Sequence, residues 1–159
     1  PMGILGLWAM GLKPCWVGKH TLFRGPLGPV FKLMGGIPVD RTVHTGFIRR
    51  IAEQYKSRDQ MALTIAAEGT RSKTEHWKTG FYHIAVEANV PVALAYLDYG
   101  NKRLGIGASF YPCGDINRDF EIIREFYKDK SGLRPEKQGP IALPPKYTAD
   151  AEQGVKDST

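Results

Sequence analysis

Residues 61–72 read MALTIAAEGTRS, an apolar run followed at once by a carboxylate, a glycine, a hydroxyl and a guanidinium. The apolar part, 61–67, is uncharged and rich in strand formers, which predicts a buried central strand. Polar residues directly after such a strand are expected at its carboxyl end, where α/β proteins place ligands. Glycine lets the backbone approach a ligand closely, and Arg71 can bind a phosphate or carboxylate through two hydrogen bonds. An ordinary solvated turn after a strand is the alternative interpretation of these residues alone.

Strand-like and helix-like segments alternate along the rest of the chain, which predicts an α/β fold. The expected strands are 15–18, 37–39, 61–67, 90–99, 102–106 and an edge strand at 110–112, and the expected helices are 2–12, 26–34, 46–56, 77–89 and 119–127. The turn Gly100-Asn101 predicts a hairpin, so the sheet should be mixed. We therefore expect a single α/β domain, a mixed sheet flanked by helices, over residues 1–130. Residues 131–159 are rich in Pro, Gly, Lys and Glu and are expected to form an irregular or disordered tail.

The net charge of +6 arises entirely in the first third of the chain. Residues 1–50 carry seven Lys and Arg and a single acid, Asp40, whereas the remaining residues carry fifteen of each sign. Such a basic surface favours an anionic partner: lipid, a phosphorylated substrate, an acidic carrier protein or nucleic acid. Nucleic acid ranks last because the chain has no arginine-rich run and no recognised reading motif. A basic face without a partner is the remaining alternative.

Two features bear on the compartment. No stretch reaches the roughly 18 apolar residues that a membrane-spanning helix needs. The two cysteines, Cys15 and Cys113, have neither metal-ligand spacing nor a paired motif, which favours a reducing compartment. We therefore expect a cytoplasmic protein.

Arginines follow two of the predicted strands, Arg41 and Arg71. If both strands point the same way, the two guanidiniums flank one cleft mouth. Together with Thr70 and Lys78 they would suit a phosphate monoester, since each charge-assisted hydrogen bond contributes about 1.5–3 kcal/mol. Alternatively, each arginine pairs with a neighbouring acid on the surface, where an ion pair contributes roughly 0–1 kcal/mol.

Three blocks in consistent order resemble the glycerophosphate and lysophospholipid acyltransferase family. They are GIPVDR at 36–41, EGTRS at 68–72 and VPV at 90–92, accompanied by WVGK at 16–19 and KTG at 78–80. The resemblance extends from residue 3 to about residue 115. It departs from the family pattern at Ala67 and Ala95, which stand where proline is common.

This resemblance implies a reaction and a set of site residues. A fatty acyl group would pass from acyl-CoA or acyl carrier protein to the hydroxyl of glycerol phosphate, lysophosphatidate or a related acceptor in phospholipid synthesis. Arg41 would bind the acceptor's phosphate, Glu68, Gly69 and Arg71 would shape the same site, and Thr70 and Lys78 complete the predicted substrate-binding set. The acyl-side or structural residues are Gly36, Pro38 and Pro91. No bound cofactor or metal is expected. An anionic membrane surface is the expected partner, with the protein peripheral to the membrane.

The family's catalytic pair, a His and an Asp separated by four residues, is not found in this sequence. The residues five positions after the four histidines are Gly25, Arg49, Phe81 and Ala88. In the family the pair precedes the WVGK stretch, so we expect this chain to begin just after it and to be inactive alone. A non-catalytic homologue that binds lipid phosphate or a carrier protein is the alternative function.

Other groups in the chain are weaker candidates for the general base. His20 neighbours Lys19 but has no evident orienting acid. His83 and Glu87 lie one helical turn apart and would form a base with its orienting acid or one face of a metal site, against the alternative of a solvated helix face. Cys113 has no activating histidine nearby in the sequence.

Overall fold

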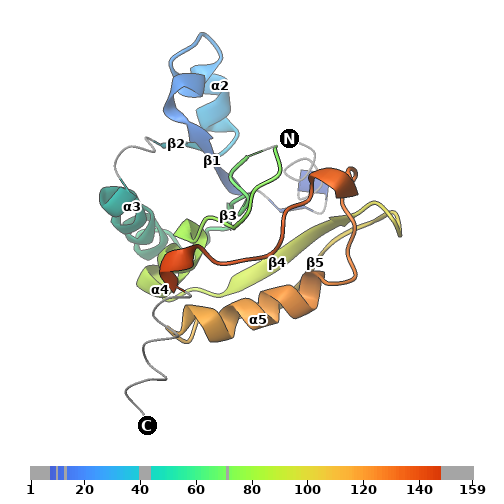
Figure 1. The fold of residues 1–159 in the computed structure, drawn as a ribbon. Coiled ribbons are helices and arrows are strands. Elements are labelled where there is room, and N and C mark those ends of the chain that lie inside the picture. The colour runs from blue at the N-terminus through green and yellow to red at the C-terminus, as the bar shows by residue number, and fades with distance from the viewer. Residues whose placement is uncertain (1–7, 10, 13, 40–43, 71, 148–159) are drawn as a thin grey trace. The chain divides into compact units, whose positions relative to one another are not determined.

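The computed structural model describes residues 8–9, 11–12, 14–39, 44–70 and 72–147 (Figure 1). The chain divides into two compact units, Pro1–Ile65 and Ala66–Thr159. Parallel and antiparallel strand pairs both occur, together with helices, so the predicted α/β class is confirmed. The two kinds of pairing lie in separate sheets of the described chain, one in each unit. The predicted domain limits, 1–130 and 131–159, stay a prediction.

The sheet of the first unit has three described strands, with β1 (Cys15–Lys19) in the middle. Strand β2 (Gly36–Val39) and strand β3 (Leu63–Thr64) both pair with β1 in parallel. Parallel neighbours require crossover connections. The 3₁₀ helix η1 (His20–Phe23) and helix α2 (Gly28–Leu33) connect β1 to β2, and helix α3 (His44–Lys56) lies between β2 and β3. All three strands therefore point the same way, and β2 and β3 end at the same edge of this sheet.

The prediction of a buried central strand over 61–67 was wrong in length, burial and position. β3 contains only Leu63 and Thr64, both half-buried, and it lies at the edge of the described sheet. A turn ends it early, because the Gly69 N–H donates to the Ala66 carbonyl at 3.0 Å. Alanine side chains are small, so this run supplies little apolar surface. The apolar pattern of 61–67 therefore overstated how much of the segment the fold buries.

An aromatic cluster holds the connection between β1 and β2 together. This connection consists of the 3₁₀ helix η1 (His20–Phe23) and the short helix α2 (Gly28–Leu33). The ring centroids of Trp16, Phe23 and Phe31 lie 5.7–6.3 Å apart, at separations typical of interacting aromatic pairs. The Trp16 indole N–H also donates to the Met34 carbonyl at 3.0 Å. The helix predicted from Pro26 to Met34 is present but shorter, since α2 covers Gly28–Leu33.

Helix α3 (His44–Lys56) has the one-sided apolar stripe that the sequence predicted for 46–56. Ile51 and Ala52 are fully buried, and Tyr55 is half-buried. The Tyr55 hydroxyl accepts a hydrogen bond from the Leu63 backbone N–H at 3.2 Å, so the end of this helix is tied to β3.

The second unit is built on a β-hairpin and two helices. Its elements are α4 (Gly80–Ala88), β4 (Val92–Asp98), β5 (Arg103–Phe110), α5 (Ile116–Tyr127) and the 3₁₀ helix η2 (Pro135–Lys137). The hairpin is as predicted, except that β5 is one continuous strand where two short strands were expected. Helix α5 lies along the hairpin (Figure 1). The core contains Phe120 and Ile123 from α5, Tyr82 from α4 and Leu94 from β4.

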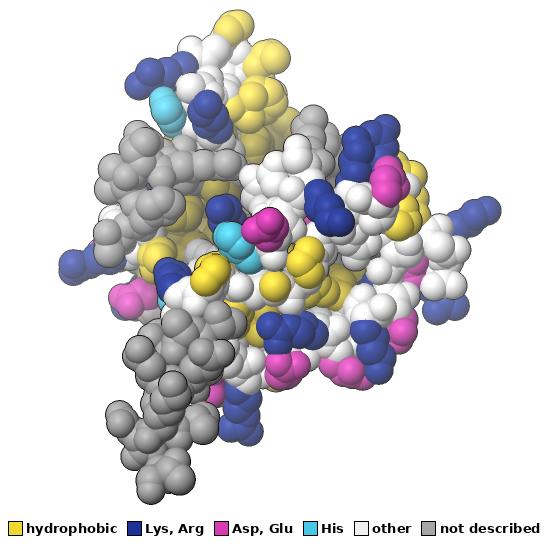
Figure 2. All heavy atoms as spheres, viewed as in Figure 1, with side chains coloured by type: hydrophobic (Ala, Val, Ile, Leu, Met, Phe, Trp, Pro, Cys, Tyr) yellow, Lys and Arg dark blue, Asp and Glu magenta, His cyan; other side chains and the backbone are white. Residues whose placement is uncertain are grey.

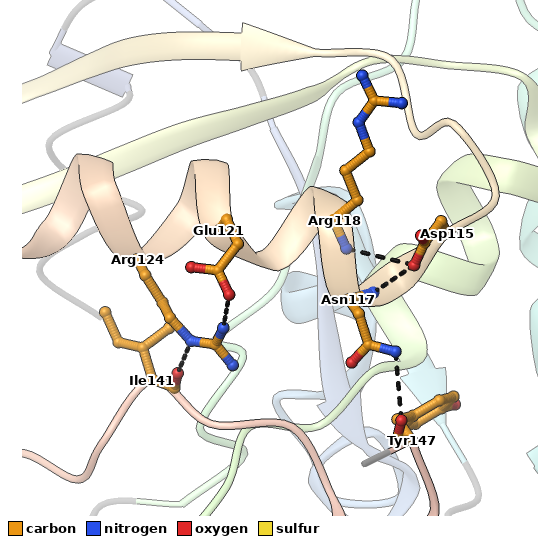
Figure 3. A network of polar contacts seen from close by, with 7 residues as sticks. All are labelled: Asp115, Asn117, Arg118, Glu121, Arg124, Ile141 and Tyr147. Atoms are coloured by element: carbon orange, nitrogen blue, oxygen red, sulfur yellow. Dashed lines mark hydrogen bonds and ion pairs between the residues drawn. The ribbon is translucent and has the colours of Figure 1, made fainter. Parts of the chain in front are cut away.

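The segment after α5 has little regular structure up to residue 147, and it packs against the rest of the second unit. Leu143 is buried in the core. The Arg124 Nε donates to the Ile141 carbonyl at 2.9 Å, and the Asn117 amide donates to the Tyr147 carbonyl at 3.2 Å (Figure 3). Helix α5 itself begins at an N-cap, where the Asp115 carboxylate accepts from two backbone N–H groups. The far end of the predicted tail, 148–159, lies outside the described residues.

The glycine at the start of β2 provides a test of this packing. A Cβ added at Gly36 would lie 2.5 Å from the Phe31 carbonyl oxygen and 2.7 Å from Phe23 Cε1. We predict that Gly36→Ala lowers the free energy of unfolding by about 1–3 kcal/mol, the usual cost of overpacking, as measured by urea denaturation. Gly25→Ala is the matched control, because nothing lies within 4 Å of its added Cβ. Equal effects of the two substitutions would contradict the packing described for Gly36.

Candidate functional site

The residues after β3 form a tight loop that returns to Lys78. Gly69 has a φ of +68°, in the left-handed region that favours glycine. The Lys78 backbone N–H donates to the Ala67 carbonyl at 2.7 Å, which closes the loop. A Cβ added at Gly69 would lie 3.0 Å from Lys78 Cγ, so the aliphatic stem of Lys78 lies against this glycine. The structure therefore brings Gly69 and Lys78 together across nine positions of sequence.

Glu68 and Thr70, on either side of Gly69, differ in environment. Burial raises the pKa of the half-buried Glu68 carboxyl above its ordinary value, because desolvation disfavours its charged form. Thr70 is exposed, and its hydroxyl oxygen accepts a hydrogen bond from the Ser72 N–H at 3.2 Å. The loop thus presents an exposed ammonium on Lys78, a hydroxyl and a carboxyl that is easier to protonate than a free one. A phosphate group would be attracted to the ammonium and accept hydrogen bonds from the donors.

The remaining predicted site residues divide into two groups. Arg41 and Arg71 lie outside the described residues, so their roles stay predictions. Gly36 is buried in β2, where its missing side chain leaves room for the Phe23 ring. Pro38 is exposed and is paired in register with Gly18, and Pro91 is exposed just before β4. The shared direction of β2 and β3, on which the two-arginine hypothesis depends, is present in the first unit's sheet.

The hypothesis that His83 works with Glu87 finds no support in the geometry. The His83 Nε2 atom lies 2.6 Å from the Tyr147 hydroxyl oxygen, and the same oxygen lies 3.2 Å from the hydroxyl of the buried Thr79. Glu87 is exposed on α4. Among the described residues, no group of three His, Cys, Asp or Glu side chains could hold a metal ion. His83 is therefore a partner of the C-terminal segment in the described structure.

Tyr147 is the residue of this cluster that the sequence did not point to. It lies 64 positions from His83, in a segment expected to be irregular. Its only sequence signal is an aromatic residue in a polar stretch, which does not identify a partner. Lys146 lies over the Tyr147 ring at 4.6 Å, and this positive charge adds to burial in lowering the pKa of His83.

Comparison with known proteins establishes the family. A family model described as Acyltransferase matches residues 3–96, which is more than half of the chain. The chain belongs to the acyltransferase family. A search of curated proteins and a search of solved structures gave no match. The matched residues include all three sequence blocks as well as Lys78.

Within the described residues, no helix is long and apolar enough to cross a membrane.

The His83 cluster predicts a dependence of stability on pH. The pKa of folded His83 lies below its ordinary value of 6.5, so the unfolded chain takes up a proton first as the pH falls. This group therefore leaves stability unchanged well above pH 6.5 and destabilises the fold as the pH drops through 6.5 toward the lower folded pKa. We expect His83→Gln to flatten that part of the profile, measured as urea midpoints between about pH 5 and pH 8.

His76→Gln serves as the control for the loss of one histidine in the same unit. Its profile shows how much of any change comes from removing a histidine as such. An unchanged slope in His83→Gln, or an equal flattening in His76→Gln, would show that His83 does not carry this dependence.

Proposed function

We propose that this chain acts in transferring a fatty acyl group from acyl-CoA or acyl carrier protein to a glycerol-type hydroxyl. The acceptors are glycerol phosphate, lysophosphatidate or a related compound, as in phospholipid synthesis. The family match over residues 3–96 carries this proposal, because it spans every block on which the finer resemblance rests. We place the reaction at the cytoplasmic surface of a membrane, with the protein peripheral to it.

In the proposed reaction, the acceptor's hydroxyl oxygen attacks the carbonyl carbon of the thioester. A carbon–oxygen bond forms and the carbon–sulfur bond breaks, which yields an ester and a free thiol. The hydroxyl proton is taken up by a general base and ends on the leaving sulfur. No redox step and no bound cofactor is needed for this balance.

The loop around Gly69 supports the acceptor-binding part of the proposal. Lys78 lies directly against its left-handed glycine, so this basic side chain belongs to the loop. In this proposal Thr70 adds a hydroxyl donor, Glu68 contacts the acceptor and Arg71 pairs with phosphate. Arg41 is assigned to phosphate binding by resemblance to the second family block.

The second candidate function depends on whether this chain works with a general base. None of the four histidines is followed five positions later by an aspartate, and His83 contacts a tyrosine. The second candidate is a non-catalytic homologue that binds lipid phosphate or an acidic carrier protein. Both candidates require the acceptor-binding loop, and only the first requires a His-x4-Asp segment joined to this chain.

We predict that the chain binds glycerol phosphate but not glycerol, as measured by isothermal titration calorimetry. Lys78→Gln should weaken the binding by about tenfold or more, because one charge-assisted hydrogen bond contributes about 1.5 kcal/mol at least. Arg41→Gln and Arg71→Gln should act in the same direction. Lys73→Gln is the matched control, since Lys73 is an exposed lysine of the same segment. Equal binding of glycerol, or equal losses for Lys73→Gln and Lys78→Gln, would contradict the assigned loop.

Acyl transfer itself separates the two candidate functions. Joining a His-x4-Asp segment before Pro1 should produce thioester-dependent acylation of lysophosphatidate or glycerol phosphate. His-x4-Asn in the same position is the control and should be strongly impaired, because the aspartate orients the histidine. No acylation across a panel of such acceptors would rule out the enzyme and leave the binding function.

A further inference from the structure

The connection between β1 and β2 carries an unusual number of exposed apolar side chains. Leu22 and Val30 are 42% and 47% exposed, Leu27 is 58% exposed, and Leu33 is 90% exposed. We call these four residues the apolar tip. In Figure 2, hydrophobic side chains lie beside Lys and Arg side chains over the α2 region at the top of the view. Single exposed leucines are common on protein surfaces, but a group of four in twelve residues of sequence indicates a contact surface.

The aromatic side chains of this connection are packed together, unlike the apolar tip. Trp16, Phe23 and Phe31 form one cluster of rings and are half-buried. Two glycines let these rings approach the backbone: an added Cβ would lie 2.7 Å from Trp16 at Gly18 and 2.7 Å from Phe23 at Gly36. The four tip residues are exposed beside this cluster.

A basic hollow lies beside the same connection, and one residue of β2 and one of α3 also line it. It has a volume of about 380 Å³, and the residues that line it are His20, Phe23, Arg24, Lys32, Pro38 and Arg50. Three of the six carry a permanent positive charge and none is acidic. The ion pairs found among the described residues involve other side chains, so no described acid neutralises these cations. The hollow and the apolar tip alternate along the chain, since Arg24 and Lys32 lie between tip residues.

We propose that the apolar tip and the basic hollow together dock this protein onto an anionic lipid bilayer. Leucine side chains enter the boundary between headgroups and acyl chains, and cations beside them bind lipid phosphates. An inorganic phosphate would satisfy the hollow but would leave the tip exposed. The bilayer is the partner that offers negative charge and an apolar layer within a few ångströms of each other.

The shape of the segment limits this contact to shallow insertion. Helix α2 has six residues, far fewer than the roughly 20 needed to cross a bilayer. The docking surface assigned here goes beyond acyl transfer, because it requires neither a thioester nor an acceptor. It names the residues that would contact the predicted anionic membrane, and all of them lie within the first unit.

Vesicle flotation of the full chain tests the proposal. The chain should bind vesicles containing phosphatidylglycerol, bind pure phosphatidylcholine vesicles far less, and lose binding as salt is raised. Each basic residue near an anionic surface contributes about fivefold to the partition onto vesicles. Arg24→Gln combined with Lys32→Gln should therefore weaken this partition by about 25-fold. Leu27→Asp combined with Leu33→Asp should weaken it by about tenfold or more.

Matched controls come from the second unit. Leu133→Asp changes a leucine that is 64% exposed, and the pair Arg118→Gln and Lys137→Gln removes two exposed charges. All variants are compared by far-ultraviolet circular dichroism and thermal unfolding, so that a folding defect is recognised. Binding that persists in the tip variant, or falls equally in the controls, overturns the proposal.

Insertion is measured separately from surface adsorption with Leu33→Trp. Brominated acyl chains should quench the added fluorescence relative to the unmodified chain, whose Trp16 lies in the aromatic cluster. Absence of added quenching shows that the tip does not insert.

Two other results also overturn the proposal. Displacement from vesicles by millimolar inorganic phosphate would make the hollow a soluble-phosphate site. Tip-dependent binding to acyl carrier protein without binding to vesicles would replace the bilayer by a carrier protein.

Discussion

The packing of one phenylalanine ring against two glycines organises the first unit. An added Cβ would lie 2.9 Å from a Phe23 ring atom at Gly18 and 2.7 Å from a Phe23 ring atom at Gly36. Because these glycines belong to β1 and β2, the ring holds η1 and α2 against both strands at once. The parallel pairing of β1 with β2 then directs the end of β2 to the same sheet edge as the end of β3. The leucines of the connection lie exposed outside this packing.

Much of the fold could be predicted because its signals are local. The hairpin between β4 and β5 follows from a turn dipeptide, and α3 and α5 follow from apolar residues at helical spacing. The strand at 61–67 was overestimated because alanine counts as apolar in a pattern but buries little surface. Which strand occupies the middle of the sheet depends on pairing between distant residues, and no local pattern specifies it.

The site was predictable to a similar degree. The Glu68–Thr70 stretch was recognisable from the order of polar residues after an apolar run, and the family match covers it. Its approach to Lys78 was suggested by residue type, whereas the contact with the Lys78 stem comes from the fold. Tyr147 could not be found from the sequence, because a single aromatic residue in a polar segment does not reveal its contact with His83. The exposure of Leu33 likewise comes only from the structure, because a leucine in an apolar run is ordinarily expected to be buried.

The central claim is that the loop around Gly69 binds the phosphate of a glycerol-type acceptor. A titration of the ¹⁵N-labelled chain with glycerol phosphate, followed by amide chemical shifts, tests it most directly. The account predicts saturable shifts at Gly69, Thr70 and Lys78, and no such shifts with glycerol. The claim would be contradicted if the signals of these three amides stayed unchanged with glycerol phosphate, or if they shifted equally with glycerol.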